Sequence, residues 1–233
     1  AGLSETEFFG SSPAVNGVCS NKMVIAAISR SLGIPTLPIL QGNPDGPLPI
    51  VLDFGGASTY FVKPKNLGAQ IGITSASKQT SLSEAWLYGQ ELIRQYRQGA
   101  IIQPYISGTD LRAMYFGNGI PESPNDRIAI YKVEKFSCDG QFVDIPEENG
   151  VNVSEYILTD IKDLKEYDPD LCRCINQYVY SIAKYLRLKD IFAIDFRIDR
   201  EGIPWFFEIN SLPFINRVSF EQYLRRFETG EFY

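Results

Sequence analysis

The sequence of 233 residues contains no histidine. Mechanisms that need an imidazole base, such as those of Ser-His-Asp and Cys-His hydrolases, are therefore excluded, as are zinc and iron sites with histidine ligands. The chain must use carboxylates, lysines, hydroxyls or backbone amides instead. It has only four cysteines, and Cys172 and Cys174 lie in a predicted helix where their side chains diverge. We expect reduced thiols, as in a cytoplasmic protein.

Long apolar runs and an excess of basic residues are also lacking. No run approaches the ~18–20 apolar residues of a membrane span, and the first nine residues contain acidic side chains but no basic flank. The 22 basic residues are outnumbered by 28 acidic ones, so the net charge of −6 opposes binding to nucleic acid. These features predict a cytoplasmic protein with neither nucleic-acid nor membrane partners.

The residues that are present predict an α+β protein. The composition, with 44% hydrophobic and 21% charged residues, is that of an ordinary globular chain. Helices are predicted from Ser20 to Leu32, from Ser81 to about Gln95 and from Asp168 to Leu186, with Ser20, Ser81 and Asp168 as their N-caps. Strands are predicted at 59–63, 100–106, 110–116, 127–135, 191–199 and 205–210. Pro104 places the second of these strands at a sheet edge or at a crossover between subdomains.

The last two predicted strands form a hairpin with two facing carboxylates. If Glu201-Gly202 is a two-residue loop, Asp195 lies opposite Glu208 and Ala193 lies opposite Asn210. At a separation of ~5 Å and an effective dielectric constant of ~20, the two carboxylates repel each other by ~3 kcal/mol. A positive charge between them is therefore expected.

Two interpretations of this carboxylate pair remain open. A hard divalent cation would use both carboxylates and the neutral oxygen of Asn210, a set suited to Mg²⁺ and to the phosphates it carries. Alternatively, the hairpin presents an ordinary polar face, on which Arg197 and a lysine neutralise the acids.

Two further segments have features of a nucleotide site. Lys63 ends a predicted strand and precedes a loop with Gly68 and Gly72, whose backbone amides can bind phosphate. The segment Gln103-Pro-Tyr-Ile106 suits a purine, and Asp110 can accept hydrogen bonds from ribose hydroxyls. Taken singly, an ordinary hairpin turn explains the first segment and a bent strand explains the second.

In their order along the chain, these segments resemble the ATP-grasp fold, and most closely the D-alanine–D-alanine ligase family. The similar segments are Gly10 to Lys22, Leu32 to Thr36, Phe61 to Pro64 with Gly68 and Gly72, Ile102 to Leu111, Asp195 to Asp199, and Phe207 to Pro213. The spacing of Asp195, Glu208 and Asn210 matches the family's metal-binding pattern.

The resemblance implies two α+β subdomains that grip a nucleotide between them. Residues 1–20 would be a remnant or linker of an N-terminal domain, 21–105 the small lid subdomain, and 106–233 the catalytic and metal-binding subdomain. The implied activity is that of an ATP-dependent carboxylate–amine ligase, which phosphorylates a carboxylate to an acyl phosphate and forms an amide bond with an amine. Its substrates would be small amino acids or peptides.

The resemblance also implies roles for individual residues. Lys22 and Lys63 would contact the ATP phosphates, which the loop from Gly68 to Gly72 would cover. Gln103, Tyr105, Ile106 and Phe207 would line the adenine pocket, and Asp110 would bind the ribose. Asp195, Glu208 and Asn210 would hold two Mg²⁺ ions, with Mn²⁺ as an alternative. Lys63, Arg197 and Ser219 are the predicted catalytic residues.

Four positions depart from the family pattern. Ala69 replaces a substrate-contacting serine, Ala193 replaces an oxyanion-stabilising arginine, and Phe214 follows Pro213 where glycine is usual. The lid's Lys-Tyr pair is not recognisable in residues 141–149. Arg197 or Arg217 is the expected substitute for the missing arginine.

These departures leave alternatives to the leading hypothesis. The chain could be a non-catalytic nucleotide-binding module derived from such a ligase, or a ligase with a different amino-acid or peptide substrate. Because the family's N-terminal domain contributes to the site and only about twenty residues precede Lys22, a missing N-terminal domain is expected to complete it. The alternative is that a homodimer completes the site.

Overall fold

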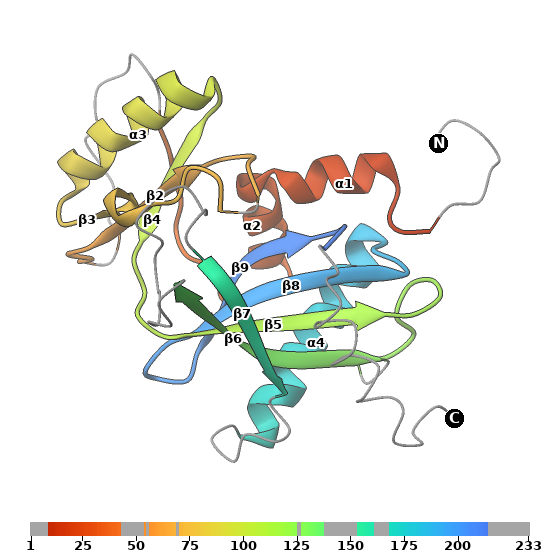
Figure 1. Cartoon of the computed structure of the whole chain (residues 1–233). Coiled ribbons are helices and arrows are strands. Elements are labelled where there is room, and N and C mark those ends of the chain that lie inside the picture. Colours follow the sequence, from red (N-terminus) through yellow and green to blue (C-terminus); the bar gives the residue numbers. More distant parts are fainter. Residues whose placement is uncertain are drawn as a thin grey trace.

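A computed structural model describes residues 9–42, 54, 56–68, 70–124, 127–137, 153–160 and 168–213. Its helices and strands form two units, each built on an antiparallel sheet (Figure 1). The smaller unit contains a four-stranded sheet and one long helix, and the larger contains a five-stranded sheet with helices on its core side. This architecture confirms the predicted α+β class.

The smaller sheet has the strand order β1-β4-β2-β3. Its strands are β1 (Leu40–Gln41), β2 (Tyr60–Pro64), β3 (Lys78–Gln79) and β4 (Ala100–Pro104), with a 3-10 helix at Ser75–Ser77. Helix α3 (Leu82–Tyr96) packs on this sheet through Trp86, Leu92 and Ile93. Its N-cap is Ser81, whose hydroxyl accepts a hydrogen bond from the Glu84 amide at 3.2 Å, as the sequence pattern predicts.

The larger sheet has the strand order β7-β6-β5-β8-β9. Its strands are β5 (Thr109–Phe116), β6 (Ile128–Ser137), β7 (Val153–Asp160), β8 (Ile191–Ile198) and β9 (Pro204–Asn210). Helix α4 (Pro169–Leu186) packs on one face through Ile175, Val179 and Ile182. Phe192 and Phe196 of β8 lie in the same core, so the opposite face of β8 carries the polar side chains.

The predicted helix from Ser20 to Leu32 is two helices, α1 (Pro13–Ser20) and α2 (Lys22–Ser31). The break is at Asn21, whose extended backbone ends α1 and whose side chain accepts hydrogen bonds from the first amides of α2. Ser20 is therefore not the N-cap, because its hydroxyl donates back to the Gly17 carbonyl at 2.8 Å. Lys22 becomes the first residue of α2.

Helices α1 and α2 pack with the larger sheet. Cys19 and Ile25 lie in the core that α4 also covers, as does Ile34 after α2, and the Phe206 amide donates to the Pro35 carbonyl at 2.9 Å. The segment around α2 thus packs on the larger sheet, whereas the predicted small subdomain begins at residue 21. The predicted domain boundaries stay predictions.

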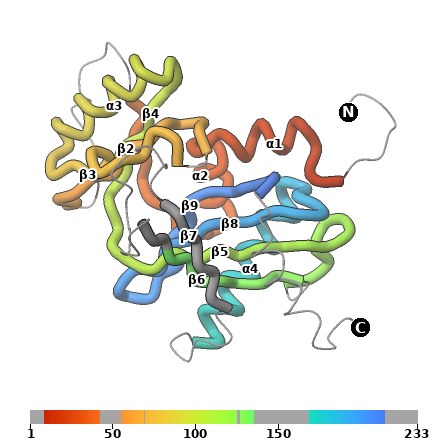
Figure 2. The backbone as a smooth tube through the Cα atoms, in the orientation of Figure 1, coloured from red at the N-terminus to blue at the C-terminus, as the bar shows by residue number. Residues whose placement is uncertain are grey.

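The position of Pro104 settles one alternative. Strand β4 lies between β1 and β2 and is not an edge strand. Pro104 is the last residue of β4, beyond the two residues that pair with β1, so its missing amide hydrogen costs no ladder bond there. The chain then crosses at residues 105–108 to β5 of the larger sheet, as Figure 2 shows.

The β8–β9 hairpin has the predicted pairs and an unpredicted loop. Asp195 lies opposite Glu208, and Ala193 lies opposite Asn210. However, Ile198 pairs with Pro204, so the loop spans residues 199–203 rather than two residues. Phe207 is an extra residue in β9, and this bulge restores the register that the longer loop would otherwise shift.

The described residues include three of the four cysteines and the helices α1 to α4. The cysteines within those ranges, Cys19, Cys172 and Cys174, form no disulfide bond. None of the described helices is long and apolar enough to cross a membrane.

A buried aspartate ties the N-terminal segment to the larger sheet. Asp190, which is 5% exposed, accepts hydrogen bonds from the amides of Gly10 at 2.8 Å and Gly119 at 2.7 Å. Its backbone has a φ of 65°, a conformation that aspartate and asparagine tolerate better than most residues. The carboxylate thus holds together segments that are distant in the sequence.

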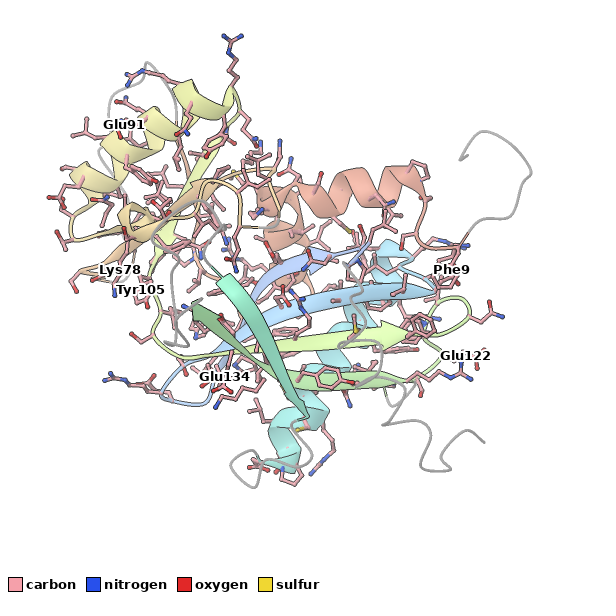
Figure 3. The ribbon with its side chains drawn as sticks, in the orientation of Figure 1. Phe9, Lys78, Glu91, Tyr105, Glu122 and Glu134 are labelled. Carbon is pink, nitrogen blue, oxygen red and sulfur yellow. The ribbon has the colours of Figure 1, made fainter. Side chains whose placement is uncertain are left out.

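We expect Asp190→Ala to lower the free energy of unfolding by about 2–3 kcal/mol, because it removes two charge-assisted hydrogen bonds and strains the backbone. Asp190→Asn should cost about 1 kcal/mol, because it keeps one acceptor and tolerates the positive φ. Urea denaturation measures both. The exposed Glu91 of α3, labelled in Figure 3, provides the control Glu91→Ala, which should change stability by less than about 0.5 kcal/mol. Equal losses for Ala and Asn at position 190 would contradict this role.

Candidate functional site

The polar face of the larger sheet carries a row of charged residues across three strands. Arg112 of β5 lies opposite Asp195 of β8, which lies opposite Glu208 of β9. The antiparallel register fixes this row, because residues that pair directly across strands share a face. Lys22 and Lys63 approach the same row from α2 and β2, so both units contribute to the cluster.

Asp195 is neutralised by an arginine that the sequence did not identify. The Arg112 Nε and Nη2 atoms donate to the two carboxylate oxygens of Asp195 at 2.8 and 2.9 Å. The Asn210 Nδ2 atom donates to Asp195 Oδ2 at 3.0 Å. The cation expected beside this carboxylate is therefore Arg112. The alternative interpretation of the sequence assigns this role to Arg197 instead. Only the pairing of β5 with β8 would have indicated Arg112, and hydrophobic periodicity does not reveal which strands are neighbours.

Glu208 lies among three cationic side chains. The Lys22 Nζ atom is 3.7 Å from Glu208 Oε2. Burial by itself raises the pKa of the Glu208 carboxyl, but the charges of Lys22, Lys63 and Arg112, together with a hydrogen bond from Asn210, outweigh burial and hold that pKa below its ordinary value. With Asp195 included, two carboxylates face three cations, and the cluster carries a net charge of +1.

The two lysines of the site are both buried. Lys22 is 7% exposed, and its Nζ atom donates to the Leu67 carbonyl at 2.5 Å, so it also holds the loop after β2. Lys63 is 6% exposed, and its Nζ atom lies 5.4 Å from the centroid of the Phe207 ring. Burial lowers the pKa of the Lys63 ammonium to about 8, although the Glu208 carboxylate opposes this shift.

Arg197 is on the same face as Asp195 but has different partners. Its Nε and Nη2 atoms donate to the carboxylate oxygens of Asp110 at 2.6 and 3.0 Å. Its Nη1 atom donates to the Ile106 carbonyl at 3.1 Å, and the guanidinium carbon is 5.2 Å from the centroid of Phe207. Arg197 thus fixes the crossover to β5. Its predicted catalytic role stays a prediction.

The segment predicted to hold adenine lies between the two units. Gln103 is 5% exposed at the end of β4, and the Tyr105 amide donates to the Thr59 carbonyl at 2.9 Å. The Lys78 Nζ atom lies 4.0 Å from the centroid of the Tyr105 ring, a cation–π contact between two residues labelled side by side in Figure 3. The sequence does not single out Lys78, because it belongs to none of the motifs named above.

The glycine-containing loop packs tightly against the end of β2. Gly72 has a φ of 76°, and a Cβ atom there would be 2.5 Å from Pro64 Cγ. Only glycine fits this conformation and this close approach. The Ile71 amide donates to the Gly68 carbonyl at 3.1 Å. The predicted contacts of Gly68 and Gly72 with phosphate stay a prediction.

The oxygen atoms of Asp195, Glu208 and Asn210 fit a hard cation. The Asn210 amide nitrogen donates to Asp195, and the Asn210 side chain also hydrogen-bonds Glu208, so the amide lies between the two carboxylates. If this amide turns over, its oxygen would join two carboxylates as a ligand, a set that suits Mg²⁺ or Mn²⁺. Within the described ranges, no group of three His, Cys, Asp or Glu side chains could hold a metal. The predicted pair of ions stays a prediction.

Several predicted positions lie outside the described residues. These are Ser219, Arg217, Phe214, Ala69 and the segment 141–149. Ala193 is described: it is fully buried in β8, opposite Asn210, and offers no hydrogen-bond donor from its side chain.

The comparisons with known proteins agree with this fold. A structure of the Vibrio cholerae D-alanyl-alanine synthetase A matches 95% of this chain and 64% of its own, with a TM-score of 0.72 and 17% identity. A Bacillus anthracis D-alanine–D-alanine ligase complexed with ATP matches 94% of this chain and 64% of its own, with a TM-score of 0.67 and 18% identity. The fold is that of the ATP-grasp ligases.

The family follows from the sequence comparison. The family model for the D-ala D-ala ligase C-terminus matches residues 57–228, and the chain belongs to this family. The D-alanine–D-alanine ligase of Coxiella burnetii (strain RSA 493 / Nine Mile phase I) is 23% identical over 216 residues, which are 91% of this chain and 54% of the relative. The chain thus spans about half the length of such relatives.

The buried ammonium of Lys63 makes stability depend on pH. Its pKa of about 8 lies below the ordinary value of 10.5, so between these values the unfolded chain binds more protons and the free energy of unfolding rises with pH. Between about pH 7 and pH 9.5, we expect the wild type to gain about 1–2 kcal/mol relative to Lys63→Met, whose side chain cannot titrate. Urea denaturation at several pH values measures the difference. Parallel pH profiles for the two proteins would contradict it.

Proposed function

We propose that this chain binds ATP between its two sheets and forms the nucleotide-binding and catalytic part of an ATP-dependent carboxylate–amine ligase. The observation that carries this proposal is the convergence of two buried lysines, Lys22 and Lys63, on the carboxylate of Glu208. Buried cations contributed by both units suit a polyanionic ligand. Its negative charge would offset the free-energy cost of burying the two lysine ammonium groups.

The lysines are the proposed phosphate ligands. Because burial weakens its hydration, the Lys63 ammonium is poised to bind an anion and returns toward full protonation when phosphate is present. Lys22 also fixes the loop through the Leu67 carbonyl, so phosphate binding and loop position would be linked. Gly68 and Gly72 are the proposed cover of the phosphates.

The crossover between the units is the proposed place of the nucleoside. Gln103, Tyr105 and Ile106 would contact adenine from β4 and the crossover, with Phe207 from β9. Asp110 would bind the ribose while Arg197 holds its carboxylate in place. Phe207 lies near both Lys63 and Arg197, so this ring would join the adenine and phosphate ends of the site.

Asp195, Glu208 and Asn210 form the proposed site of divalent cations, Mg²⁺ or Mn²⁺. When bound, such a cation would neutralise phosphate charge and orient the phosphoryl group. The protein's own part is to hold these three side chains on one sheet face, beside the lysines.

The proposed reaction joins a small amino acid or peptide carboxylate to an amine. The carboxylate takes the γ-phosphoryl group of ATP, which leaves ADP and an acyl phosphate. The amine then attacks the acyl carbon and an amide bond forms. Phosphate leaves with the electron pair of the broken C–O bond, and the proton that the nitrogen loses ends on that phosphate. This chemistry requires no histidine, in agreement with the composition. The names of the relatives, which are D-alanine–D-alanine ligases, support an amino-acid substrate.

A second candidate function is nucleotide binding without amide formation. Ala193 favours it, because its buried side chain cannot stabilise an oxyanion, and loss of such a donor typically costs a few kcal/mol in the transition state. Ligation by the full-length protein would exclude this candidate.

We expect Mg-ATP to raise the melting temperature of the chain by about 5–10 °C at a concentration near 100 times its Kd. Lys63→Met should remove most of this shift, because it deletes a buried phosphate ligand while filling the space. The matched control is Lys184→Met, an exposed lysine on α4, which should keep the full shift. Thermal unfolding with and without Mg-ATP tests the proposal. If neither the wild type nor the control responds to Mg-ATP, the chain is not a nucleotide-binding protein.

We further expect the full-length protein to release ADP and form an amide when it is given ATP, Mg²⁺ and a mixture of amino acids. Mass spectrometry of the products identifies the joined pair, and Lys63→Met should reduce product by at least about 100-fold. ATP binding without any amide product would instead support the non-catalytic candidate.

A further inference from the structure

The pair between Arg112 and Asp195 bears on how many metal ions the site can hold. We propose that the Arg112 guanidinium takes the place of one of the two divalent cations, so that the nucleotide is bound with a single metal ion carried by Glu208 and Asn210. This inference rests on the proposed function, because it concerns the same nucleotide site.

The first argument is the hydrogen-bonding capacity of Asp195. A carboxylate has about four lone-pair positions. Two of those of Asp195 accept from Arg112 Nε and Nη2, and a third accepts from Asn210 Nδ2. A metal ion that used both oxygens of Asp195 would have to displace a bidentate arginine, the most favourable geometry for an ion pair with a carboxylate.

The second argument is the contrast with Glu208. Its nearest cation, the Lys22 Nζ atom, is 3.7 Å away, beyond hydrogen-bonding distance, whereas the contacts of Arg112 with Asp195 are at most 2.9 Å. Glu208 therefore keeps more capacity for a metal ion than Asp195 does. Asn210 neighbours both carboxylates and can turn its amide oxygen toward the ion that Glu208 holds.

The third argument is the balance of charge. The cluster already has a net charge of +1, and an arginine in a protein does not lose its proton. A first divalent ion is offset by the phosphate chain it accompanies. A second ion at Asp195 would lie against the fixed charge of Arg112, with Lys22 and Lys63 close by. Arg112 instead supplies positive charge at that place without a metal.

The geometry of the sheet also fixes the position of Arg112. It lies on β5, directly across from Asp195, and is held there by the strand pairing rather than by a flexible loop. Its side chain is 29% exposed and that of Asp195 is 19% exposed, so the pair is partly shielded from solvent. Shielding strengthens the attraction between the two charges relative to an exposed pair.

Counting bound Mn²⁺ ions tests the proposal without reference to activity. The chain is saturated with the non-hydrolysable β,γ-imido analogue of ATP, bound nucleotide is measured by equilibrium dialysis, and bound Mn²⁺ is measured from the loss of the free-ion electron paramagnetic resonance signal. We expect one Mn²⁺ per bound nucleotide for the wild type. Arg112→Met, which frees the carboxylate of Asp195, should bind two.

Two further variants sharpen the count. Arg173→Met removes an exposed arginine of α4 and should keep the wild-type stoichiometry. Arg112→Lys keeps the charge but loses the bidentate geometry, and should bind a second Mn²⁺ at least about tenfold more weakly than Arg112→Met does. If Arg112→Met does not fold, Arg112→Lys and the wild-type count still decide the question.

The outcomes are distinct. Two Mn²⁺ ions per nucleotide on the wild type, or an unchanged single ion on the folded Arg112 variants, would overturn the role of Arg112 and leave the proposed function intact. Failure of the wild type to bind the nucleotide analogue in dialysis would overturn the proposed function, and this inference with it.

Discussion

The register of β8 with its two neighbours is the constraint on which the site depends. It sets Arg112, Asp195 and Glu208 in one row, because paired residues on adjacent strands share a face. A shift of a single residue would turn Asp195 into the core and bring Phe196 to the polar face. The same strand register therefore places the apolar side chains in the core under α4 and the charged side chains on the opposite face. A change of register would disrupt both.

The charged side chains of the cluster lie in pairs of opposite sign. Arg112 forms an ion pair with Asp195, Arg197 forms one with Asp110, and Lys22 lies beside Glu208. Breaking one of these pairs would leave a partly buried charge uncompensated, which is more costly than removing both partners. The wild-type arrangement is thus internally balanced, and an anionic ligand would meet a cluster with a small positive excess.

Local patterns in the sequence were enough to predict some elements, and the failures have physical causes. Helix α3 begins after Ser81 and α4 begins at Pro169 as the capping residues indicate, because these signals act within one turn. The break at Asn21 was missed because Ser20 offers an equally plausible cap. The facing of Asp195 and Glu208 was correct although the loop was wrong, since the bulge at Phe207 compensates for it. The position of Arg112 opposite Asp195 could not be predicted, because local periodicity does not show which strands are neighbours in the sheet.

Among the described residues, the backbone crosses between the units at two places, and these crossings restrict how the molecule can move. The backbone enters the smaller unit between Thr36 and Leu40 and leaves it between Pro104 and Thr109. A body attached at two points turns most easily about the line that joins them, so rotation of the smaller unit about that line would need the least rearrangement of the backbone. Rotation about that axis changes the distance from Lys63 to Phe207 while the backbone pairing within each sheet is preserved. Ligand capture and release would then follow a single path rather than a diffuse loosening of the fold.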